Sequence, residues 1–395
     1  MSQTFYPLAS TTWNSLEYEA LNRVIESGNF TMGNEVQAYE QIFAEYVGAK
    51  YAVMSNSGSS ANLIMLAAAR YVKNSILNEG DAVIVPAVSW STTYYPVHQL
   101  GLSLSFVDVD PNTLNIDSDK VIEAINEKTK AILVVNLLGN PADLLRLREI
   151  SKEYGLLLLE DNCESLGASI NGKQAGTFGL AGTYSSFFSH HISTMEGGIT
   201  TTDDLAFYET MKSLRAHGWT RDLPEKNNVY NKTGDKCDDL YRFVLPGYNF
   251  RPLELEGALG QEQVKKLPDF IENRRINAQY LMSVSNNFPR IQLQKENGVS
   301  SWFGFSLVLK EGLAGKRSEL IKMLNNFGIQ SRPVVAGNFT LNPVMRYLRH
   351  EKLPDLPNAT NVHKNGLFVG NHHFDLKPQI DRLVEVLVEF EEKND

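Results

Sequence analysis

Apolar and polar residues alternate along this chain in two rhythms, one typical of helices and one of buried strands. Short apolar runs bounded by turn residues indicate buried strands, and stretches with a helical period lie between them. We expect strands at 82–86, 104–109, 131–137, 156–160, 183–188, 198–202 and 302–309. We expect helices at 61–72, 119–125, 142–154, 205–216, 252–284 and 380–391. Alternation of this kind predicts an α/β protein with a mixed, mostly parallel sheet between helices.

The chain has 395 residues and is longer than one typical domain, so we expect two domains packed together. Residues 1–14 are interpreted as an N-terminal arm and 15–251 as the large domain. Residues 252–395 are interpreted as a linking helix followed by a smaller C-terminal α/β domain. Within the large domain, residues 222–239 are polar and aperiodic, which predicts an exposed loop beside a substrate site.

Composition narrows the classes of partner. The net charge of −9 argues against a clustered basic surface, so we expect neither nucleic acid nor a membrane as partner. The first residues show no basic leader, and no apolar run reaches the roughly 18 residues of a membrane helix, which predicts a cytoplasmic protein. Two cysteines, Cys163 and Cys237, are too few for a disulfide framework or a thiolate metal cluster, and we expect no metal site.

The segment from Ser57 to Asn62 places small residues at the start of a predicted helix. Backbone N–H groups at a helix N-terminus lack a partner inside the helix and, together with the helix dipole, favour an anion such as phosphate. Simple capping of the helix by a serine is the alternative, and for this segment alone it is the more frequent case. The segment is therefore a candidate phosphate site.

Asp161 follows the apolar run 156–159 and Glu160, at the carboxyl end of a predicted buried strand. Ligand sites of α/β sheets lie at these strand ends. A carboxylate there can keep the nitrogen of a pyridine ring protonated, which strengthens the ring as an electron sink. A helix cap or an ion pair with a surface arginine is the alternative for Asp161.

Trp90 lies four residues after the predicted strand 82–86. Its large flat side chain can stack on a planar cofactor, although core packing is the default role of a tryptophan. What favours the functional interpretation is the order of features: a phosphate site, a stacking aromatic residue and a carboxylate occur at successive strand ends. This order indicates a phosphorylated aromatic cofactor.

Several stretches of the chain resemble the DegT/DnrJ/EryC1/StrS sugar aminotransferases, a family with the aspartate-aminotransferase fold, which is fold type I of the PLP-dependent enzymes. The matching stretches are 57–59, Trp90, 160–161 and 185–198, and further 6–10, 86–96, 137–141, 216–221, 245–252 and 366–372. The resemblance covers nearly the whole chain. It implies pyridoxal 5'-phosphate (PLP) and its amine form, pyridoxamine 5'-phosphate, as cofactors.

One position departs from the pattern of this family. The family motif has a serine, four further residues and then a lysine that binds the cofactor covalently, followed shortly by two glycines. Counting from Ser185 places His190 at the lysine position, and Gly197 and Gly198 follow. Because an imidazole cannot form the covalent bond that lysine forms, we expect the cofactor to be bound non-covalently. The chain therefore resembles the small branch of the family that dehydrates sugars.

The resemblance to this branch implies a reaction. The implied substrate is a GDP-linked 4-keto-6-deoxy sugar, and L-glutamate is the implied amino donor. The C3 hydroxyl of the sugar leaves, and the products are a 3-deoxy keto sugar, 2-oxoglutarate and ammonia. His190 is the implied catalytic residue, because an imidazole titrates near neutrality and can both take and return a proton. His191 is the competing assignment, and the spacing from Ser185 favours His190.

The resemblance also implies how a cofactor is held. Gly58, Ser59 and Ser185 are expected to contact its phosphate. Asp161 is expected to meet the ring nitrogen, and Trp90 is expected to cover one face of the ring.

Five further residues receive roles from the resemblance. Glu164 is expected near the phenolic oxygen of the cofactor, where a carboxyl group can tune protonation. Asn249 is similar to a residue that family members lend to the partner subunit's cofactor phosphate, which implies a homodimer with shared active sites. His217, Arg221 and Arg332 are expected to contact the substrate or glutamate, because a positive fork suits diphosphate and carboxylate oxygens. Ordinary surface ion pairs are an equally frequent reason for any one of these side chains.

Two alternatives remain open at this point. One is a nucleotide-sugar aminotransferase that tolerates histidine, and the other is a non-catalytic ligand-binding scaffold of the same fold. The scaffold predicts decay of the rest of the site, whereas Asp161, Ser185 and the phosphate segment are all present. A related dehydratase with an iron–sulfur cluster and a reductase partner is disfavoured because two cysteines cannot supply the cluster.

Overall fold

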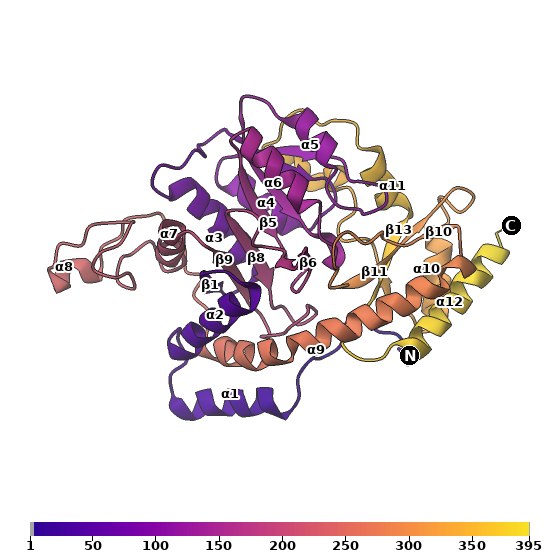
Figure 1. The fold of residues 1–395 in the computed structure, drawn as a ribbon, viewed down its shortest axis with the longest axis horizontal. Coiled ribbons are helices and arrows are strands. Elements are labelled where there is room, and N and C mark those ends of the chain that lie inside the picture. The colour runs from indigo at the N-terminus through magenta and orange to yellow at the C-terminus, as the bar shows by residue number, and fades with distance from the viewer. Residues whose placement is uncertain (1–3, 395) are drawn as a thin grey trace.

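A seven-stranded sheet forms the centre of the larger part of the molecule (Figure 1). The computed structural model describes residues 4–394. Its strands are β1 (Tyr51–Ser55), β2 (Ala82–Pro86), β3 (Ser103–Val107), β4 (Thr129–Val135), β5 (Leu157–Asp161), β8 (Ala181–Ser185) and β9 (Gly198–Thr202). The spatial order is β1-β9-β8-β5-β4-β2-β3, and only the pairings of β9 with β1 and β8 are antiparallel. The predicted mixed, mostly parallel sheet is confirmed.

Helices cover both faces of this sheet, so that its strands are buried on both sides. One face packs against α3 (Gly58–Tyr71), α4 (Ser91–Gln99) and α7 (Leu205–Arg215). The other face packs against α5 (Ser118–Ala124) and α6 (Leu144–Glu153), and further along against α2 (Asn34–Val47) and α9 (Glu254–Val284). The result is a three-layer arrangement in which the sheet is fully enclosed.

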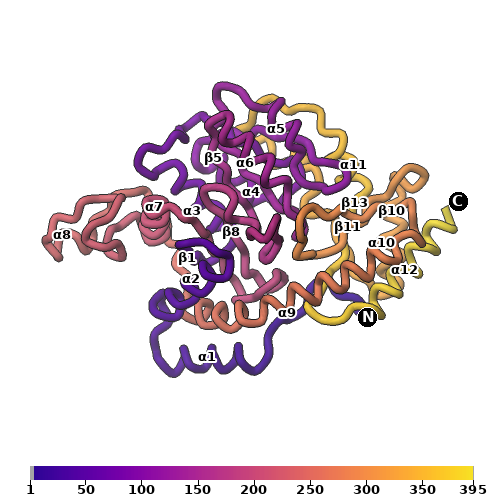
Figure 2. Tube along the Cα trace, in the orientation of Figure 1, coloured from indigo at the N-terminus to yellow at the C-terminus, as the bar shows by residue number. Residues whose placement is uncertain are grey.

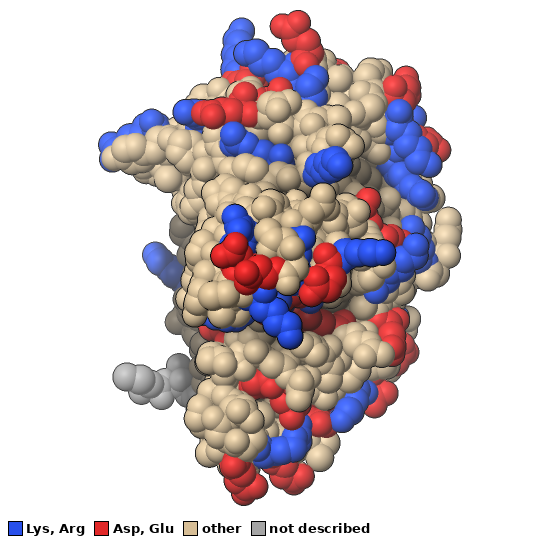
Figure 3. Space-filling model, turned by 90° about the vertical axis from the view of Figure 1, so that its left-hand side faces the viewer, with Lys and Arg blue, Asp and Glu red and all other residues tan. Residues whose placement is uncertain are grey.

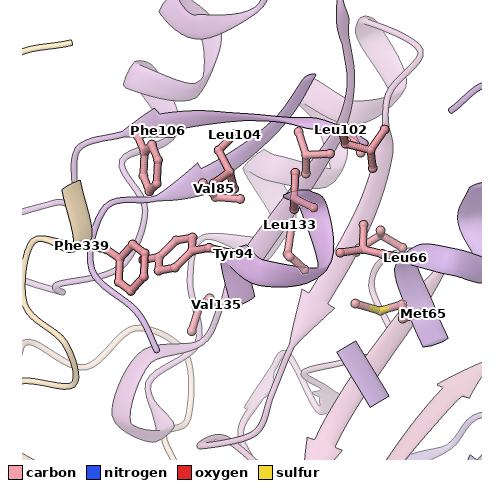
Figure 4. Packing of buried hydrophobic residues seen from close by; sticks show 14 of the residues in the cluster. Met65, Leu66, Val85, Tyr94, Leu102, Leu104, Phe106, Leu133, Val135 and Phe339 are labelled. Atoms are coloured by element: carbon pink, nitrogen blue, oxygen red, sulfur yellow. The ribbon is translucent and has the colours of Figure 1, made fainter. Parts of the chain in front are cut away.

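The core beside α3 and α4 is dense and includes aromatic contacts (Figure 4). The ring of Tyr94 on α4 lies 5.3 Å from that of Phe106 on β3 and 4.2 Å from that of Phe339. Tyr94 also donates from its hydroxyl to the backbone oxygen of Pro86, at 2.9 Å. These contacts fix the start of α4 against the end of β2.

A second, four-stranded antiparallel sheet lies beside the first part, in the C-terminal third of the chain (Figure 1). Its order is β10 (Ile291–Gln292), β11 (Gly304–Leu309), β13 (Gly366–Gly370) and β12 (Ser331–Arg332). Its own hydrophobic cluster includes residues of α9, α10 (Arg317–Asn326) and α12 (Lys377–Glu392). The helix α11 (Pro357–Asn365) leads into β13. The boundaries after residues 14 and 251 stay a prediction.

The helix α9 runs along both parts of the molecule (Figure 2). Val264, Leu267 and Ile271 pack in the cluster with α2, whereas Ala278 and Leu281 pack in the cluster of the small sheet. The segment that precedes α1 (Ser15–Ser27) lies along α9 as well. At its beginning, the fully buried Tyr6 donates to the backbone oxygen of Gly370 at 2.6 Å, so this segment is packed rather than detached.

Several predicted elements differ in their ends from the structure. The helix expected at 61–72 begins three residues earlier, at Gly58, because Ser57 caps it there. The strand expected at 183–188 ends at Ser185, where a loop toward β9 begins. The segment 222–239, expected as a loop, is mostly irregular but ends in a short helix, α8 (Lys236–Leu240), whose start is capped by Asp235. Figure 1 shows that this region extends away from the body of the molecule.

Neither surface charge nor hydropathy points to a specialised surface. On the face shown in Figure 3, basic and acidic side chains are interspersed rather than gathered by sign. Among residues 4–394, no helix is both long enough and apolar enough to cross a membrane. The same residues include no group of three or more His, Cys, Asp or Glu side chains that is placed to hold a metal ion.

Candidate active site

The segment 57–60 forms the first turn of α3 and lies against the end of β8. Ser57 caps the helix, and its hydroxyl accepts from the backbone N–H of Ser60 at 3.1 Å. The N–H groups of Gly58 and Ser59 belong to the first turn, where no intrahelical acceptor exists. Capping by Ser57 therefore leaves the N–H groups of Gly58 and Ser59 available to an anion, and the phosphate site stays a prediction.

Gly58 brings this turn against Ser185. A Cβ atom built on Gly58 would lie 2.7 Å from Cβ and 3.0 Å from Oγ of Ser185. Any larger residue at position 58 would therefore collide with Ser185. The lack of a side chain at Gly58 lets the turn of Gly58 and Ser59 lie against Ser185, and these are the three residues predicted to contact one phosphate.

We expect Gly58→Ala to weaken binding of a phosphorylated ligand by about tenfold or more, because overpacking by one methyl group costs about 1–3 kcal/mol and displaces Ser185. Spectroscopic titration with PLP measures the change. Gly80→Ala is the matched control, because a Cβ atom there meets nothing within 4 Å. It carries a backbone strain of its own but leaves the affinity unchanged. Equal affinity in Gly58→Ala and wild type would contradict this account of the turn.

Asp161 ends β5 and is buried among hydrogen-bond donors. Its Oδ2 atom accepts from Nδ2 of Asn62 at 2.8 Å and from Oγ1 of Thr93 at 2.9 Å, and its Oδ1 atom accepts from the backbone N–H of Cys163 at 3.2 Å. Thr183 in turn donates to Oδ1 of Asn62 at 2.5 Å. These donors fix the orientation of the carboxyl group.

The contacts of Asn62 and Thr93 with Asp161 were not predicted, since Asn62 was only the end of the candidate phosphate segment and Thr93 was given no role. Each lies about one helical turn inside the helix that begins at a predicted site segment, Asn62 in α3 and Thr93 in α4. A polar residue in the first turns of an otherwise buried helix is the signal that the sequence offered. Their partner on β5 is distant in the chain, however, and the spacing alone does not identify it.

Trp90 immediately precedes α4 and remains 58% exposed. It therefore does not serve the core, which was the default interpretation of this residue. Thr93, one turn later, contacts Asp161, so the indole lies at the N-terminal end of the helix that supports the carboxylate. A large exposed aromatic surface beside buried polar groups is typical of a binding site.

His190 and His191 lie in the loop between β8 and β9, and their environments differ. His191 is only 1% exposed, and its Nε2 atom lies 3.2 Å from the backbone oxygen of Ser301. His190 retains some exposure, although its Nδ1 atom is buried. Burial lowers the pKa of His190 to about 4, and the charge of Arg274 acts in the same direction. The accessible histidine is therefore neutral at physiological pH and can accept a proton.

Glu164 lies in the segment after β5, and its Oε2 atom accepts from the backbone N–H of Leu138 at 3.0 Å. The pKa of Glu164 is raised to about 7. Burial is the main cause and the charge of the neighbouring Asp161 adds to it, whereas the hydrogen bond from Leu138 lowers the pKa. The side chain is therefore poised between its two protonation states near neutral pH.

We expect Glu164→Gln to be about as stable as wild type at pH 5 and more stable at pH 8. The folded protein holds the Glu164 proton more tightly than the unfolded chain, so the stabilisation by this proton is present at low pH and is lost as pH rises through about 7. Glutamine keeps an acceptor for Leu138 but cannot ionise. Urea unfolding of both proteins without added cofactor, at pH 5 and 8, measures the difference. A difference independent of pH contradicts the raised pKa.

The four remaining predicted residues lie in two regions of the structure: His217, Arg221 and Asn249 in one, and Arg332 in the other. Ala216 pairs with Asn249 and Trp219 pairs with Phe243, which aligns the segments that carry His217, Arg221 and Asn249. The guanidinium of Arg221 lies 3.8 Å from the Trp219 ring and pairs with Asp222 at 3.4 Å. Asn249 is exposed and accepts from Nε of Arg251 at 3.0 Å.

The second place is the small sheet. Arg332 lies on β12, is exposed, and makes no hydrogen bond or ion pair to His217, Arg221 or Asn249 among the interactions of residues 4–394. The first group approaches the phosphate turn, because the N–H of Asn56 donates to the backbone oxygen of Phe250 at 3.1 Å. Their roles in binding stay predictions.

The fold and these side chains define the class of protein. Residues 12–387 match the model of the DegT/DnrJ/EryC1/StrS aminotransferase family, and the chain belongs to this family. Within it, the chain is similar to two enzymes named GDP-4-keto-6-deoxy-D-mannose 3-dehydratase. The one from Yersinia pseudotuberculosis is 54% identical over 97% of this chain and 98% of its own length. The one from Escherichia coli O55:H7 is 53% identical over 97% and 99%.

A crystal structure of GDP-4-keto-6-deoxymannose-3-dehydratase with a trapped PLP–glutamate geminal diamine superposes on this chain with a TM-score of 0.94. It is 53% identical and covers 97% of this chain and 100% of the other. The aspartate-aminotransferase-like fold predicted from the resemblance is thereby confirmed.

Proposed function

We propose that this chain is a PLP-dependent 3-dehydratase that removes the C3 hydroxyl of GDP-4-keto-6-deoxy-D-mannose. L-Glutamate is the amino donor, and the products are GDP-4-keto-3,6-dideoxy-D-mannose, 2-oxoglutarate and ammonia. The observation that carries this proposal is His190 at the family's lysine position, in a chain more than half identical to dehydratases of this name over nearly its full length.

The residues present fit the cofactor. The turn at 57–59 offers N–H groups to a phosphate and is closed against Ser185 by the missing side chain of Gly58. Asp161 offers an oriented carboxylate to a ring nitrogen. When bound, PLP supplies an aldehyde that condenses with amines and a ring that accepts an electron pair.

Residues of the chain hold the reacting groups in place. Asp161 keeps the proton on the ring nitrogen, and the exposed indole of Trp90 covers the ring and excludes water from that face. Glu164, with a pKa of about 7, can share a proton with a phenolic oxygen nearby. Position 190 is a histidine, which cannot bind the cofactor covalently as a lysine would. The cofactor can therefore leave the site in its amine form and be replaced in its aldehyde form.

His190 moves the protons. Neutral at pH 7, it would take the proton from the α-carbon of glutamate and deliver it to the cofactor carbon that carries the nitrogen. In the sugar half of the cycle it would take a proton from that same carbon and deliver it to the C3 oxygen as that oxygen leaves. Because its environment disfavours the charged form, an imidazole that has accepted a proton gives it up readily. One residue thus serves as base and acid in turn.

The overall reaction balances. Oxidation of glutamate to 2-oxoglutarate supplies two electrons, and replacement of the C3 hydroxyl by hydrogen consumes them. The water that leaves from C3 equals the water used to release ammonia and 2-oxoglutarate. No external reductant is required.

We extend the proposal to the assembly and the location of the enzyme. Asn249 is exposed and is therefore available to a second copy of the chain, as a homodimer with shared active sites requires. His217, Arg221 and Arg332 remain the proposed contacts for the substrate or glutamate. We place the enzyme in the cytoplasm, because both substrates are charged metabolites that do not cross a membrane unaided.

The test is a reaction of purified protein with PLP, L-glutamate and GDP-4-keto-6-deoxy-D-mannose, in which 2-oxoglutarate, ammonia and the mass of the sugar are followed together. A 3-deoxy keto sugar with an equal amount of ammonia is the expected result. An amino sugar without ammonia would identify an aminotransferase. An unchanged sugar, together with no spectral change on addition of glutamate, would favour the non-catalytic scaffold.

A further inference from the structure

His190 has an unusual setting for an acid–base imidazole. Such a ring is commonly oriented by a hydrogen bond at the nitrogen that does not react. Here the buried Nδ1 atom of His190 makes no hydrogen bond to any residue of 4–394. The backbone oxygen of Phe187 faces the ring and favours its protonated form, and the main-chain N–H of His190 donates to that same oxygen at 2.8 Å. Packing of the neighbouring rings is therefore a further constraint on the orientation of the imidazole, beside the Phe187 oxygen.

Two aromatic rings pack against the His190 imidazole. The Phe187 ring lies 6.0 Å away in an edge-on arrangement at 74°, and the Phe303 ring lies 5.3 Å away at 39°. Phe187 belongs to the same loop as His190 and is largely exposed. Phe303 comes from the segment that leads into β11 and is half-buried, so it is the better-anchored neighbour.

The main chain of Phe303 is held on both sides. Its N–H donates to the backbone oxygen of Leu138 at 3.0 Å, and its carbonyl oxygen accepts from Nη1 of the buried Arg274 at 3.2 Å. Gly139 permits this approach, since a Cβ atom there would lie 2.7 Å from the Phe303 nitrogen. Leu138 is also the residue whose N–H donates to Glu164. The Phe303 ring is thus placed by the same loop that contacts the proposed cofactor site.

The Phe303 ring contacts His191, the second histidine of the loop, as well as His190. The His191 imidazole also lies against Phe303, at 5.7 Å, but it is buried and its Nε2 atom lies beside the backbone oxygen of Ser301. Phe303 therefore contacts one imidazole that is fixed by its surroundings and one that is free to react.

We propose that Phe303 is a positioning residue, which holds the His190 imidazole in its reacting orientation by aromatic packing. The inference rests on the proposed function, in which His190 moves the protons, and adds to it a residue that acts through His190. Proton transfer is sensitive to the placement of the transferring group, and a displacement of about 1 Å can cost about 100-fold in rate.

The decisive variant is Phe303→Leu, which keeps an apolar side chain but removes the flat ring. We expect kcat to fall about tenfold or more, while KM for both substrates and the affinity for PLP stay within about threefold. The glutamate-dependent spectral change and C3 deoxygenation should slow in parallel, because His190 serves both. Phe303→Tyr keeps the ring and should restore the rate. Phe327→Leu, at the end of α10, is the matched control and should retain the wild-type rate.

A second measurement does not depend on turnover. In protein labelled at the histidine Cε1 positions, the His190 signal is assigned by its loss in His190→Asn. We expect Phe303→Leu to shift or split this signal, because the ring current of Phe303 is removed and the imidazole gains a second orientation. Signals of histidines that do not contact Phe303, such as His350, should stay in place.

The outcomes separate the two proposals. A wild-type rate in Phe303→Leu, or an equal loss in Phe303→Tyr and Phe303→Leu, overturns the positioning role, as does an unmoved His190 signal. Equal losses in kcat and in PLP affinity overturn it too, because they indicate general damage to the site. If wild type converts no sugar, the proposed function fails, and the histidine signals still decide whether Phe303 orients His190.

Discussion

His190→Asn should lose C3 deoxygenation by a factor on the order of 10²–10⁴, the usual contribution of a general acid–base residue. Asparagine has a similar size but cannot exchange a proton near neutral pH. PLP affinity should stay within a few-fold of wild type, because the phosphate turn and Asp161 are formed by other elements. Sugar mass and ammonia measure turnover, and spectroscopic titration measures cofactor binding.

The neighbouring histidine provides the control for this substitution. His191 is buried, so His191→Asn should affect stability more than chemistry and retain C3 deoxygenation within about tenfold of wild type in the protein that folds. Normal turnover in His190→Asn, combined with loss in His191→Asn, would reverse the assignment. Normal turnover in both would remove the imidazole from the mechanism.

Asp161→Asn should lower kcat by a factor on the order of 10²–10³, in the range found when one electrostatic partner is removed from an active site. The amide is neutral and cannot hold a proton on the ring nitrogen, so the ring becomes a weaker electron sink. The side-chain oxygen can still accept from Asn62 and Thr93, so the local fold should persist. Steady-state rates and the rate of the glutamate-dependent spectral change measure the effect.

The matched control for this carboxylate is Asp204→Asn. Asp204 caps α7 by accepting from the N–H of Phe207 at 2.8 Å and lies outside the proposed site. We expect a small loss of stability, up to about 1 kcal/mol, and an unchanged kcat. If Asp161→Asn retained more than half of the wild-type rate, the carboxylate would have a structural role only.

Two strands were predicted to the residue, one a continuous apolar run and the other rich in β-branched threonine, which favours strands. The predicted strands 82–86 and 198–202 coincide with β2 and β9. The helix α4 was not predicted, since its sequence contains threonines, tyrosines and Pro96, which are poor helix formers. Its stability comes from tertiary contacts such as those of Tyr94, which local patterns do not contain.

The candidate site was predictable to the extent that its residues lie at strand and helix ends. Ser57 to Ser59, Asp161 and Ser185 occupy such ends, and the resemblance supplied the meaning of His190. The contacts of Asn62 and Thr93 with Asp161, and of Phe303 with His190, join segments far apart in the chain. Such contacts depend on how the elements pack, so no local spacing reveals them.

The course of α9 limits how the two parts of the molecule can move. One continuous helix is packed in the core of each sheet, and its Arg274 side chain also anchors the segment that carries Phe303. A clamshell rotation between the sheets would have to bend this helix, most easily near Pro268, where the backbone lacks a donor. If the proposed substrate enters the site, we therefore expect loops rather than a rotation of the two parts to give way, and the segment that carries Phe303 to keep its place on α9.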